Sequence, residues 1–325
     1  MLDQYGRKID YIRISITDRC NLRCMYCMPE AGVESVEHDD ILRYDEIVRL
    51  AEMFAGLGIT KVKITGGEPL VRKDAPELIR LLKELPGIDN VTLTTNGILL
   101  KEQMADLAAA GLDAVNISLD ALEEDRFKEI TRREGLGLVM EGIEEALRYP
   151  EVRVKINCVL LEGINEDQWI PMAGLAKDRD LDVRFIEMMP IGFGARFCGE
   201  TQEEVVRLLE EAYGRTTPVT GKFGNGPSTY MKIEGFKGKI GFISAMSHKF
   251  CGDCNRIRLT SEGFLKPCLQ FSTGGDLRTP LRSGEPDESI REQIEKTIFR
   301  KPRSHRFEER RQEGFEMRKM SEIGG

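Results

Sequence analysis

The sequence lacks several features that define whole classes of protein. Its 325 residues contain no apolar run close to the roughly 20 residues that a membrane span requires. The N-terminal stretch MLDQYGRKIDY has no apolar signal core, so we expect a cytoplasmic protein. The formal net charge of −8 argues against a nucleic-acid-binding surface, which would be broadly basic. This charge still permits an anionic small substrate, because a pocket can be locally positive.

Cysteine is the residue type that stands out. The eight cysteines include two groups of three at short spacing. Because a cytosolic setting keeps thiols reduced, such groups indicate metal binding or catalysis rather than disulfides. The other two are Cys158, which we expect to be buried against helices, and Cys198, which has no evident partner.

The hydrophobic pattern predicts alternating strands and helices. The predicted strands are Tyr11–Thr17, Lys61–Thr65, Val91–Thr95, Ala114–Asp120, Val152–Val159 and Asp182–Met188. The predicted helices are about Tyr44–Leu57, Pro76–Leu85, Lys101–Ala110, Leu138–Tyr149, Asp167–Lys177 and Glu203–Tyr213. This alternation predicts an α/β fold with a parallel sheet. A complete TIM barrel needs eight repeats, so six predict an incomplete (β/α)6 barrel.

After about residue 215 the pattern changes to short strands joined by Gly-rich turns. Strands are predicted within TYMKIEG, KIGFIS and RIRLTSEGFLKPC, and helices at Asp276–Arg282 and Ser289–Phe299. We therefore divide the chain into a partial-barrel domain, residues 1–215, and a smaller C-terminal α+β region, residues 216–325. The charge-dense segment from Arg300 onward is expected to be solvated, and His38 and His305 to lie on the surface.

The predicted strands have one apolar and one polar face. Polar faces carry Tyr11, Arg13, Ser15, Thr17, Lys61, Lys63, Thr65, Thr92, Thr94, Asn96, Asn116, Ser118, Asp120, Arg153, Lys155 and Asn157. Buried parallel strands are normally apolar on both faces. A polar and often cationic face therefore predicts an internal pocket for an anion. Antiparallel strands with a solvent face are an alternative, which would not explain the intervening helices.

The first cysteine group, CNLRCMYC, comprises Cys20, Cys24 and Cys27 directly after the first predicted strand. Three thiolates can hold an iron–sulfur cluster and leave one iron open to a further ligand. A zinc site completed elsewhere is the alternative. Zinc motifs favour two-residue spacings, and the three-residue gap between Cys20 and Cys24 argues against it.

The C-x3-C-x2-C spacing resembles the signature of the radical S-adenosylmethionine (SAM) superfamily. In that superfamily the open iron binds the methionine part of SAM, and one electron then cleaves SAM to a 5′-deoxyadenosyl radical. The resemblance extends to GGEP at Gly66–Pro69. It implies that SAM is contacted by Tyr26, Gly67, Asn96, Ser118 and Met189. These motifs follow predicted strands, and active sites of parallel α/β barrels lie at the carboxyl ends of strands.

The second cysteine group comprises Cys251, Cys254 and Cys268, in a C-x2-C-x13-C pattern. With His248 these thiols could form a Cys3His zinc site, and a purely structural cluster is also possible on spacing alone.

Two arginines follow this group and change its interpretation. Arg256 and Arg258 alternate with Ile257, so both guanidinium groups point the same way. A planar guanidinium suits phosphate, carboxylate and base edges. The pair favours a substrate site beside an open-sited cluster.

Taken together, these motifs resemble the GTP 3′,8-cyclase family (molybdenum cofactor biosynthesis protein A) over nearly the whole chain. The matching stretches are YGRKIDYIRISITDRCNLRCMYCMP, KITGGEPLVRKD, LTTNG, VNISLD, VKINCV, VRFIEMMP, FCGDCNRIRLT, LKPCL and the final Gly-Gly. Superfamily members that act on peptides usually carry a larger cysteine set in the C-terminal region, and this sequence does not.

The resemblance implies two 4Fe–4S clusters, SAM as cofactor and GTP as substrate. The second cluster's open iron would bind guanine. GTP would be contacted by Arg13, Lys63, Thr94, Lys155, Arg184, Arg256, Ile257 and Arg258. Catalytic roles fall to Arg256, Arg258, Gly324 and Gly325, the glycine tail reaching into the active site. The radical would take the 3′ hydrogen of the ribose, and the ribose carbon would attack guanine C8. The product, 3′,8-cyclo-7,8-dihydro-GTP, begins molybdopterin biosynthesis.

One position departs from the family pattern, which usually has arginine where this chain has Lys63. Lysine keeps the charge but loses the bidentate fork. The implied partners are a low-potential flavodoxin or ferredoxin and the next enzyme of the pathway, with no membrane or nucleic acid, and a homodimer is compatible. Two alternatives stay open: a radical SAM enzyme for another substrate such as a peptide, and a zinc-stapled nucleotide-binding regulator.

Overall fold

The centre of the fold is a run of six parallel strands. The computed structural model describes residues 1–221, 223–309 and 314–324. The central strands are β1 (Tyr11–Ser15), β2 (Lys61–Thr65), β3 (Asn90–Thr95), β4 (Ala114–Ser118), β5 (Arg153–Leu160) and β6 (Leu181–Glu187). Each pairs in parallel with the next. The predicted α/β fold with a parallel sheet is confirmed, and the antiparallel alternative is wrong.

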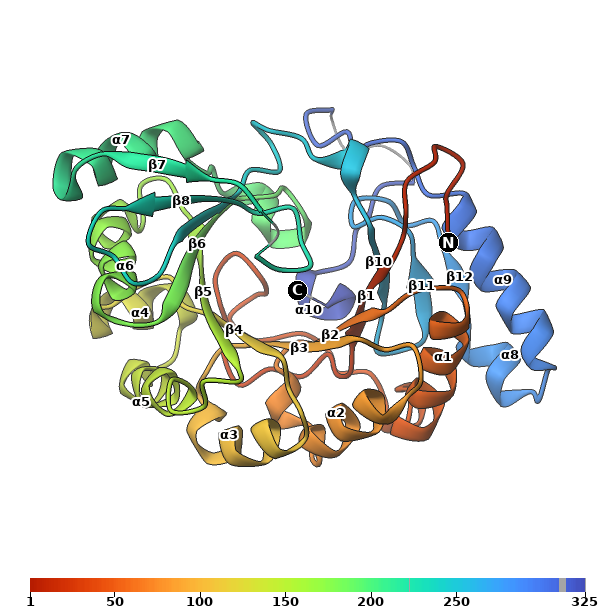
Figure 1. Cartoon of the computed structure of the whole chain (residues 1–325). Helices are drawn as coiled ribbons and strands as arrows, with labels where there is room; N and C mark the ends of the chain where they lie inside the picture. The colour runs from red at the N-terminus through yellow and green to blue at the C-terminus, as the bar shows by residue number, and fades with distance from the viewer. Residues whose placement is uncertain (222, 310–313, 325) are drawn as a thin grey trace.

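Helices connect these strands and cover the convex side of the curved sheet (Figure 1). They are α1 (Tyr44–Gly56), α2 (Ala75–Glu84), α3 (Leu100–Ala109), α4 (Glu124–Thr131), α5 (Leu136–Ala146), α6 (Glu166–Asp178) and α7 (Gln202–Tyr213). Short 3-10 turns are η1 (His38–Asp40), η2 (Pro69–Val71), η3 (Gly192–Arg196) and η4 (Cys251–Asp253). The sequence analysis does not predict α4, which buries only Phe127, Ile130 and Thr131. Among the helices of the described ranges, none has the length and hydrophobicity needed to cross a membrane.

The later strands extend the same sheet at both edges. β9 (Ile240–Ile243) pairs with β6, followed outward by β8 (Thr229–Ile233) and β7 (Thr216–Val219). On the other edge, β10 (Arg256–Leu259) pairs in parallel with β1, followed by β11 (Phe264–Lys266) and β12 (Gly275–Asp276). The helices here are α8 (Arg278–Arg282), α9 (Asp287–Phe299) and α10 (Met320–Ile323). β7, β12 and α10 are too short to leave a clear sequence pattern.

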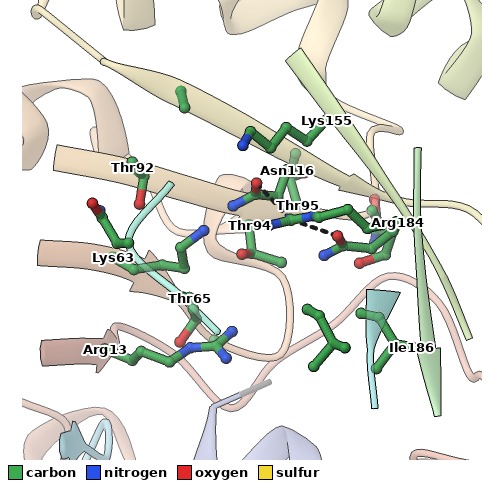
Figure 2. Close-up of a pocket in the computed structure, with 18 of the residues that line it drawn as sticks. Arg13, Lys63, Thr65, Thr92, Thr94, Thr95, Asn116, Lys155, Arg184 and Ile186 are labelled. Atoms are coloured by element: carbon green, nitrogen blue, oxygen red, sulfur yellow. Dashed lines mark hydrogen bonds between the residues drawn. The ribbon is translucent and has the colours of Figure 1, made fainter. Parts of the chain in front are cut away.

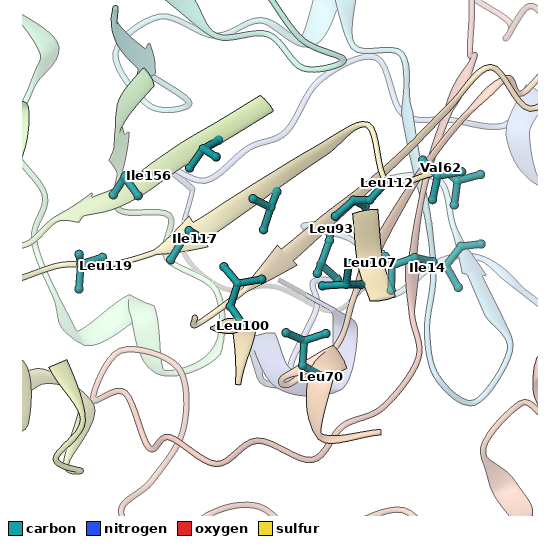
Figure 3. Close-up of a cluster of buried hydrophobic side chains, with 14 of the residues drawn as sticks. Ile14, Val62, Leu70, Leu93, Leu100, Leu107, Leu112, Ile117, Leu119 and Ile156 are labelled. Carbon is teal, nitrogen blue, oxygen red and sulfur yellow. The ribbon is translucent and has the colours of Figure 1, made fainter. Parts of the chain in front are cut away.

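Apolar side chains from neighbouring strands form the core between the sheet and its helices (Figure 3). The register brings Ile14, Ile64, Leu93, Val115 and Val154 into one row across five strands. A one-residue slip would turn this row inward and bring the polar faces against the helices. The hydrophobic effect therefore fixes which side chains face the concave side of the sheet. Cys158 is fully buried in this core, as predicted.

Part of the segment after Arg300 is packed against the body of the protein, so the prediction of a solvated segment is wrong for residues such as Lys301, although others, such as Arg306 and Met317, are exposed. Lys301 is buried and donates hydrogen bonds to the carbonyls of Arg256, at 2.7 Å, and Pro267. His305 is also buried, where the sequence analysis expected a surface residue, and its Nε2 lies 2.8 Å from the Ala245 carbonyl. Backbone carbonyls compensate these polar groups, and charge density along the sequence cannot reveal such partners.

The core assignment predicts a large effect of truncation at Ile117. This residue is fully buried, so Ile117→Ala should lower the free energy of unfolding by about 2–5 kcal/mol through lost burial and a residual cavity. Urea denaturation followed by circular dichroism measures the change. Leu138→Ala is the matched control, since Leu138 is 50% exposed, and its effect should stay within about 0.5 kcal/mol. Equal losses in the two variants would contradict the core assignment.

Candidate active site

The concave side of the sheet encloses a cavity of about 490 Å³. Its walls are formed by the inward side chains of the central strands, including Arg13, Lys63, Thr94, Lys155 and Arg184 (Figure 2). The prediction that the polar strand faces enclose a pocket is confirmed by this arrangement. The same alternation that buries one face among helices exposes the other to the cavity.

Positive charge predominates in the cavity wall, to which the described residues contribute seven cationic and three anionic side chains. The register sets Arg13 directly between Arg258 on β10 and Lys63 on β2. Burial, together with the neighbouring charges of Arg184, Arg13 and Lys155, lowers the pKa of Lys63 well below its usual value. Burial and the nearby arginines also lower the pKa of Arg258. Such crowding of like charge favours an anionic ligand.

Hydrogen bonds hold two of these cations in position. Arg184 donates through Nη2 to the side-chain oxygens of Asn116, at 2.7 Å, and Asn157, at 2.6 Å. Lys155 donates to the Tyr230 hydroxyl at 3.0 Å and to the Phe223 carbonyl. The printed partners of Arg184 are neutral, so this residue keeps its net charge toward the cavity. Lys155 also pairs with Asp182, whose carboxylate lies 3.6 Å from its Nζ and offsets part of its charge.

The first cysteine group lies at the cavity wall just beyond the end of β1. Burial raises the pKa of Cys27 to about 12 and that of Cys20 to about 11. Burial also raises the pKa of Cys24, with further contributions from Cys27, Asp120 and Cys20, so the three thiols are close neighbours. The Leu22 amide donates to Cys20 Sγ at 3.4 Å, and the Ser321 backbone amide acts to lower the pKa of Cys27.

The two glycines of GGEP allow the end of β2 to pack directly on the cysteine loop. The Gly67 amide donates to the Thr17 carbonyl at 2.7 Å, and the Glu68 amide to the Arg19 carbonyl at 2.8 Å. A Cβ at Gly67 would lie only 2.4 Å from the Arg19 carbonyl oxygen. Glycine is therefore required by this close backbone approach.

Buried carboxylates tie the residues around this loop together. Glu68 accepts hydrogen bonds from the Asn96 amide at 2.6 Å and the Thr95 hydroxyl at 2.8 Å, and burial raises its pKa to about 7. Asp120 accepts from the Tyr26 hydroxyl at 2.7 Å, and burial raises its pKa to about 6. The sequence analysis assigned no role to either carboxylate, although both belong to motifs that it singled out, GGEP and NISLD.

The second cysteine group lies on the turn η4 and just after β11. The pKa of Cys251 is raised by burial, with smaller contributions from Cys254 and Cys268, so these thiols also converge. Burial would raise the pKa of Cys254 too, but Lys301 and Arg256 outweigh it and lower the value to about 6. The Cys251 sulfur accepts the His305 amide at 3.4 Å. Lys301 and His305 left no recognisable signal in the sequence.

The zinc alternative that uses His248 does not match this geometry. His248 Nε2 lies 3.4 Å from Glu203, its other ring nitrogen lies 3.0 Å from the Ser247 hydroxyl, and the side chain is 60% exposed. In residues 1–221, 223–309 and 314–324, no three His, Cys, Asp or Glu side chains are arranged to hold a single metal ion. A cluster fits three converging thiols better, because its irons and sulfides separate the ligands more widely than one zinc does.

The C-terminal segment enters the cavity beside the two arginines that follow the second cysteine group. Arg256 and Arg258 line the cavity, and Arg258 donates to the Gly324 carbonyl at 2.6 Å. Gly324 has a φ of +88°, and a Cβ there would lie 2.8 Å from the Ser15 Cβ. The predicted position of the tail thus holds for Gly324, while Gly325 lies outside the described residues. The Ile257 side chain packs in the core and does not line the cavity.

Two family profiles and several full-length relatives match this chain. The sequence profile of the radical SAM superfamily matches residues 14–176, and that of Molybdenum Cofactor Synthesis C matches residues 181–307. The GTP 3′,8-cyclase of Clostridium perfringens (strain 13 / Type A) is 48% identical over 330 residues, covering 100% of both chains. That of Petrotoga mobilis is 46% identical over 331 residues, again covering 100% of both chains. The chain belongs to the GTP 3′,8-cyclase family of the radical SAM superfamily.

A solved structure of lower similarity supports the fold alone. Streptococcus suis SuiB, in a crystal structure with S-adenosylmethionine, matches with a TM-score of 0.61 at 16% identity. The match covers 87% of this chain and 68% of SuiB. It is the radical SAM fold that the two proteins share.

Membership of the GTP 3′,8-cyclase family implies 4Fe–4S clusters and SAM, and the two cysteine groups fit clusters. Each group brings three thiols together, so a four-iron cluster held there would keep one iron without a cysteine ligand. Amide donors to sulfur, as at Cys20 and Cys251, are typical of cluster thiolates and stabilise their negative charge. The raised thiol pKa values around Cys20 describe the metal-free protein, since iron holds its thiolate ligands deprotonated.

The predicted site residues come together with few exceptions. Those that line the cavity are Arg13, Cys20, Cys24, Tyr26, Cys27, Lys63, Gly67, Thr94, Asn96, Ser118, Lys155, Arg184, Met189, Arg256 and Arg258. The second cysteine group borders the cavity through Arg256, which lowers the Cys254 pKa. The sequence analysis missed the loop Phe223–Ser228, which closes part of the wall.

The close approach at Gly67 generates a prediction about assembly of the first cluster. In Gly67→Ala the new methyl group would displace the backbone of residues 18–19 and with it Cys20. Anaerobically reconstituted Gly67→Ala should therefore retain about half of the wild-type iron and sulfide, because only one of two clusters forms. Gly56→Ala is the control, since a Cβ at this helical position meets nothing within 4 Å. Wild-type iron content in Gly67→Ala would contradict this role for the glycine.

Proposed function

We propose that this protein is a GTP 3′,8-cyclase, a radical SAM lyase that forms 3′,8-cyclo-7,8-dihydro-GTP in the first step of molybdopterin biosynthesis. The observation that carries the proposal is full-length identity of 43–48% to relatives of that name. The cationic cavity between two cysteine groups supports it, because a nucleoside triphosphate is strongly anionic.

The first cysteine group and its surroundings are proposed to hold a cluster and SAM. Cys20, Cys24 and Cys27 would bind three irons, and Tyr26, Gly67, Asn96, Ser118 and Met189 would contact SAM. When bound, cluster and SAM supply the one-electron chemistry that removes the 3′ hydrogen atom of the ribose. The chain's own contribution is to orient the reactants and exclude water, which the buried walls of the cavity favour.

The second group, Cys251, Cys254 and Cys268, is proposed to hold a cluster whose open iron binds guanine. Arg256 and Arg258 lie beside it and would assist ring closure by stabilising charge on the nucleotide. Gly324, which accepts a hydrogen bond from Arg258, would fix the orientation of that guanidinium group. The role of Gly325 remains part of the proposal.

The triphosphate is proposed to bind the cations that project from the strands. Arg13, Lys63, Thr94, Lys155 and Arg184 line one continuous wall. The backbone at Ile257 would contribute there, since its side chain faces the core. Lys63 offers a single ammonium group where the family usually has arginine, so it would contact one phosphate oxygen rather than two. The anion would restore the lowered pKa of Lys63 toward its usual value.

The domain division and cellular context belong to the same proposal. We regard residues 1–215 as an incomplete (β/α)6 barrel and residues 216–325 as a C-terminal region that carries the second cluster. The second matching profile begins earlier, at residue 181. A cytoplasmic location, a flavodoxin or ferredoxin as electron donor, the next pathway enzyme as product acceptor and a homodimer follow from the family resemblance.

A peptide substrate is less well supported than GTP. The SuiB structure with precursor peptide SuiA matches this chain at only 15% identity, which supports the fold and not the substrate. The GTP 3′,8-cyclases match at three times that identity over both full chains.

The decisive test of the proposed function is an anaerobic incubation with GTP, SAM and reductant, followed by product identification. We expect 3′,8-cyclo-7,8-dihydro-GTP together with 5′-deoxyadenosine. Iron and sulfide analysis of the same preparation should give about eight of each per chain. Cleavage of SAM in the presence of a peptide, without consumption of GTP, would contradict the cyclase proposal. Zinc without sulfide in the protein would contradict radical SAM chemistry of any kind.

The position of Arg258 generates a second functional prediction. Arg258→Ala should lower kcat for cyclisation by about 10²–10³-fold, because a buried charge next to the reacting nucleotide is lost. Iron and sulfide content should be unchanged, since Arg258 is not a cluster ligand. Arg49→Ala serves as control, because Arg49 forms only an exposed ion pair with Asp287. Full activity of Arg258→Ala would refute the assigned role.

A further inference from the structure

Lys266 and Glu316 form an ion pair that is almost completely buried. The exposed fractions of the two side chains are 0% and 2%. Lys266 is the last residue of β11, two positions before Cys268, while Glu316 belongs to the C-terminal segment, residues 314–324. Removing two charges from water is costly, and an apolar pair of similar size often stabilises a protein as well or better. Stability alone therefore does not account for this pair.

The pair joins the C-terminal segment to the chain that follows Cys268. Lys266 Nζ donates to the Glu316 carboxylate and also to the Phe271 carbonyl, at 2.5 Å. The Glu316 amide donates to the Gln270 carbonyl at 2.6 Å. Phe271 forms an antiparallel bridge with Phe315, and their rings lie 5.6 Å apart. Glu316 thus reaches its position only when residues 266–271 have their native conformation.

Beyond Glu316 the segment makes a series of directional contacts. Arg318 donates through its amide and its Nε to Glu316 Oε1, at 3.0 and 3.1 Å. The Lys319 Cα lies 3.1 Å from the position that a Cβ at Gly192 would occupy, so the segment packs closely against Gly192. The Glu322 carboxylate then accepts a hydrogen bond from the Lys319 amide at 2.6 Å and so caps the N-terminus of α10.

The far end of the segment reaches both the first cysteine group and the catalytic arginines. Ser321 lines the same cavity wall as Cys27, and its backbone amide acts to lower the pKa of that thiol. Three residues later, the Gly324 carbonyl accepts from Arg258. Figure 1 shows α10 on the concave side of the sheet, next to β1 and β10. The segment therefore connects the second cysteine group, through Lys266, to the first, through Ser321.

Register is the property that a buried ion pair can supply here. The ring contact of Phe271 and Phe315 is nondirectional, and their backbone bridge could re-form with other residues after a slip, whereas the Glu316 carboxylate meets the Lys266 ammonium group in a single alignment. Gly324 lies eight residues beyond Glu316 and fits between Ser15 and Thr65 without room for a Cβ. A slip of one residue that brings Ile323 to the place of Gly324 would bring a side chain into that gap.

We propose that Lys266 and Glu316 are a positioning pair: they set the register of the C-terminal segment and make its insertion beside Arg258 depend on the folded loop that carries Cys268. The structural part of this inference stands on the contacts above. Its consequence for turnover rests on the proposed function.

Hydrogen exchange of the anaerobically reconstituted holoenzyme tests the structural part. In Glu316→Gln, the amides of residues 318–324 should exchange about tenfold faster or more, because the charged hydrogen bonds from Lys266 and Arg318 to the Glu316 carboxylate are weakened or lost. The amides of β10 should be unchanged. Lys249→Met is the matched control: it breaks an exposed ion pair with Glu308 and should leave the exchange of residues 318–324 at the wild-type rate.

A second variant controls for general destabilisation, because Glu316→Gln leaves the buried Lys266 without a carboxylate partner. Lys266→Met/Glu316→Gln removes both charges and should also release the segment. Faster exchange confined to residues 318–324 in either variant supports the proposal. Wild-type exchange of these residues in both variants, or equal acceleration throughout β10, overturns it.

Kinetics test the consequence for turnover separately. Glu316→Gln should lower kcat by about tenfold or more while KM for GTP stays within about threefold, because the segment orients Arg258 and leaves the strand cations untouched. Iron and sulfide content should match wild type. A wild-type kcat despite a released segment would overturn the positioning role. If the wild-type enzyme consumes no GTP, the proposed function fails, and the exchange experiment still decides whether the pair sets the register.

Discussion

The interior of this protein depends on one electrostatic constraint: like charges stand side by side in the middle of a sheet. Arg258, Arg13 and Lys63 are aligned across β10, β1 and β2. Burial, and after it repulsion by neighbouring cations that include Arg13, lowers the pKa of Arg258 and of Lys63. The repulsion is tolerated because the apolar faces of the same strands are anchored against helices. An anion that enters relieves this repulsion, so part of its binding free energy comes from the unfavourable charge distribution of the ligand-free cavity.

The features that depend on local sequence could be predicted. Strict alternation in segments such as YIRISIT and KVKIT predicted both the strands and their cationic faces, because side-chain direction in a strand follows from position alone. The cysteine spacing and GGEP then predicted the first site. Helix α4 escaped because its short segment buries few side chains.

The contacts between residues far apart in the sequence could not be predicted in the same way. That β10 pairs with β1, or that Lys301 supports the Cys254 region, depends on contacts between residues far apart in sequence. The burial of His305 likewise follows from the Ala245 carbonyl 60 positions earlier. The charge-rich composition suggested a solvated tail. In the structure, buried charges of this region have specific partners, as Lys266 pairs with Glu316. Composition gives the number of charges and cannot give their pairing.

The strand order also has a consequence for synthesis of the chain. β1 ends at Ser15, yet its outer neighbour β10 is complete only at Leu259. While the ribosome makes the intervening chain, β1 is an unprotected edge strand with free hydrogen-bonding groups. Pairing of such distant segments is slow to form and leaves an aggregation-prone intermediate. Truncated or stalled chains that end before β10 therefore lack the strand that covers this edge in the folded protein.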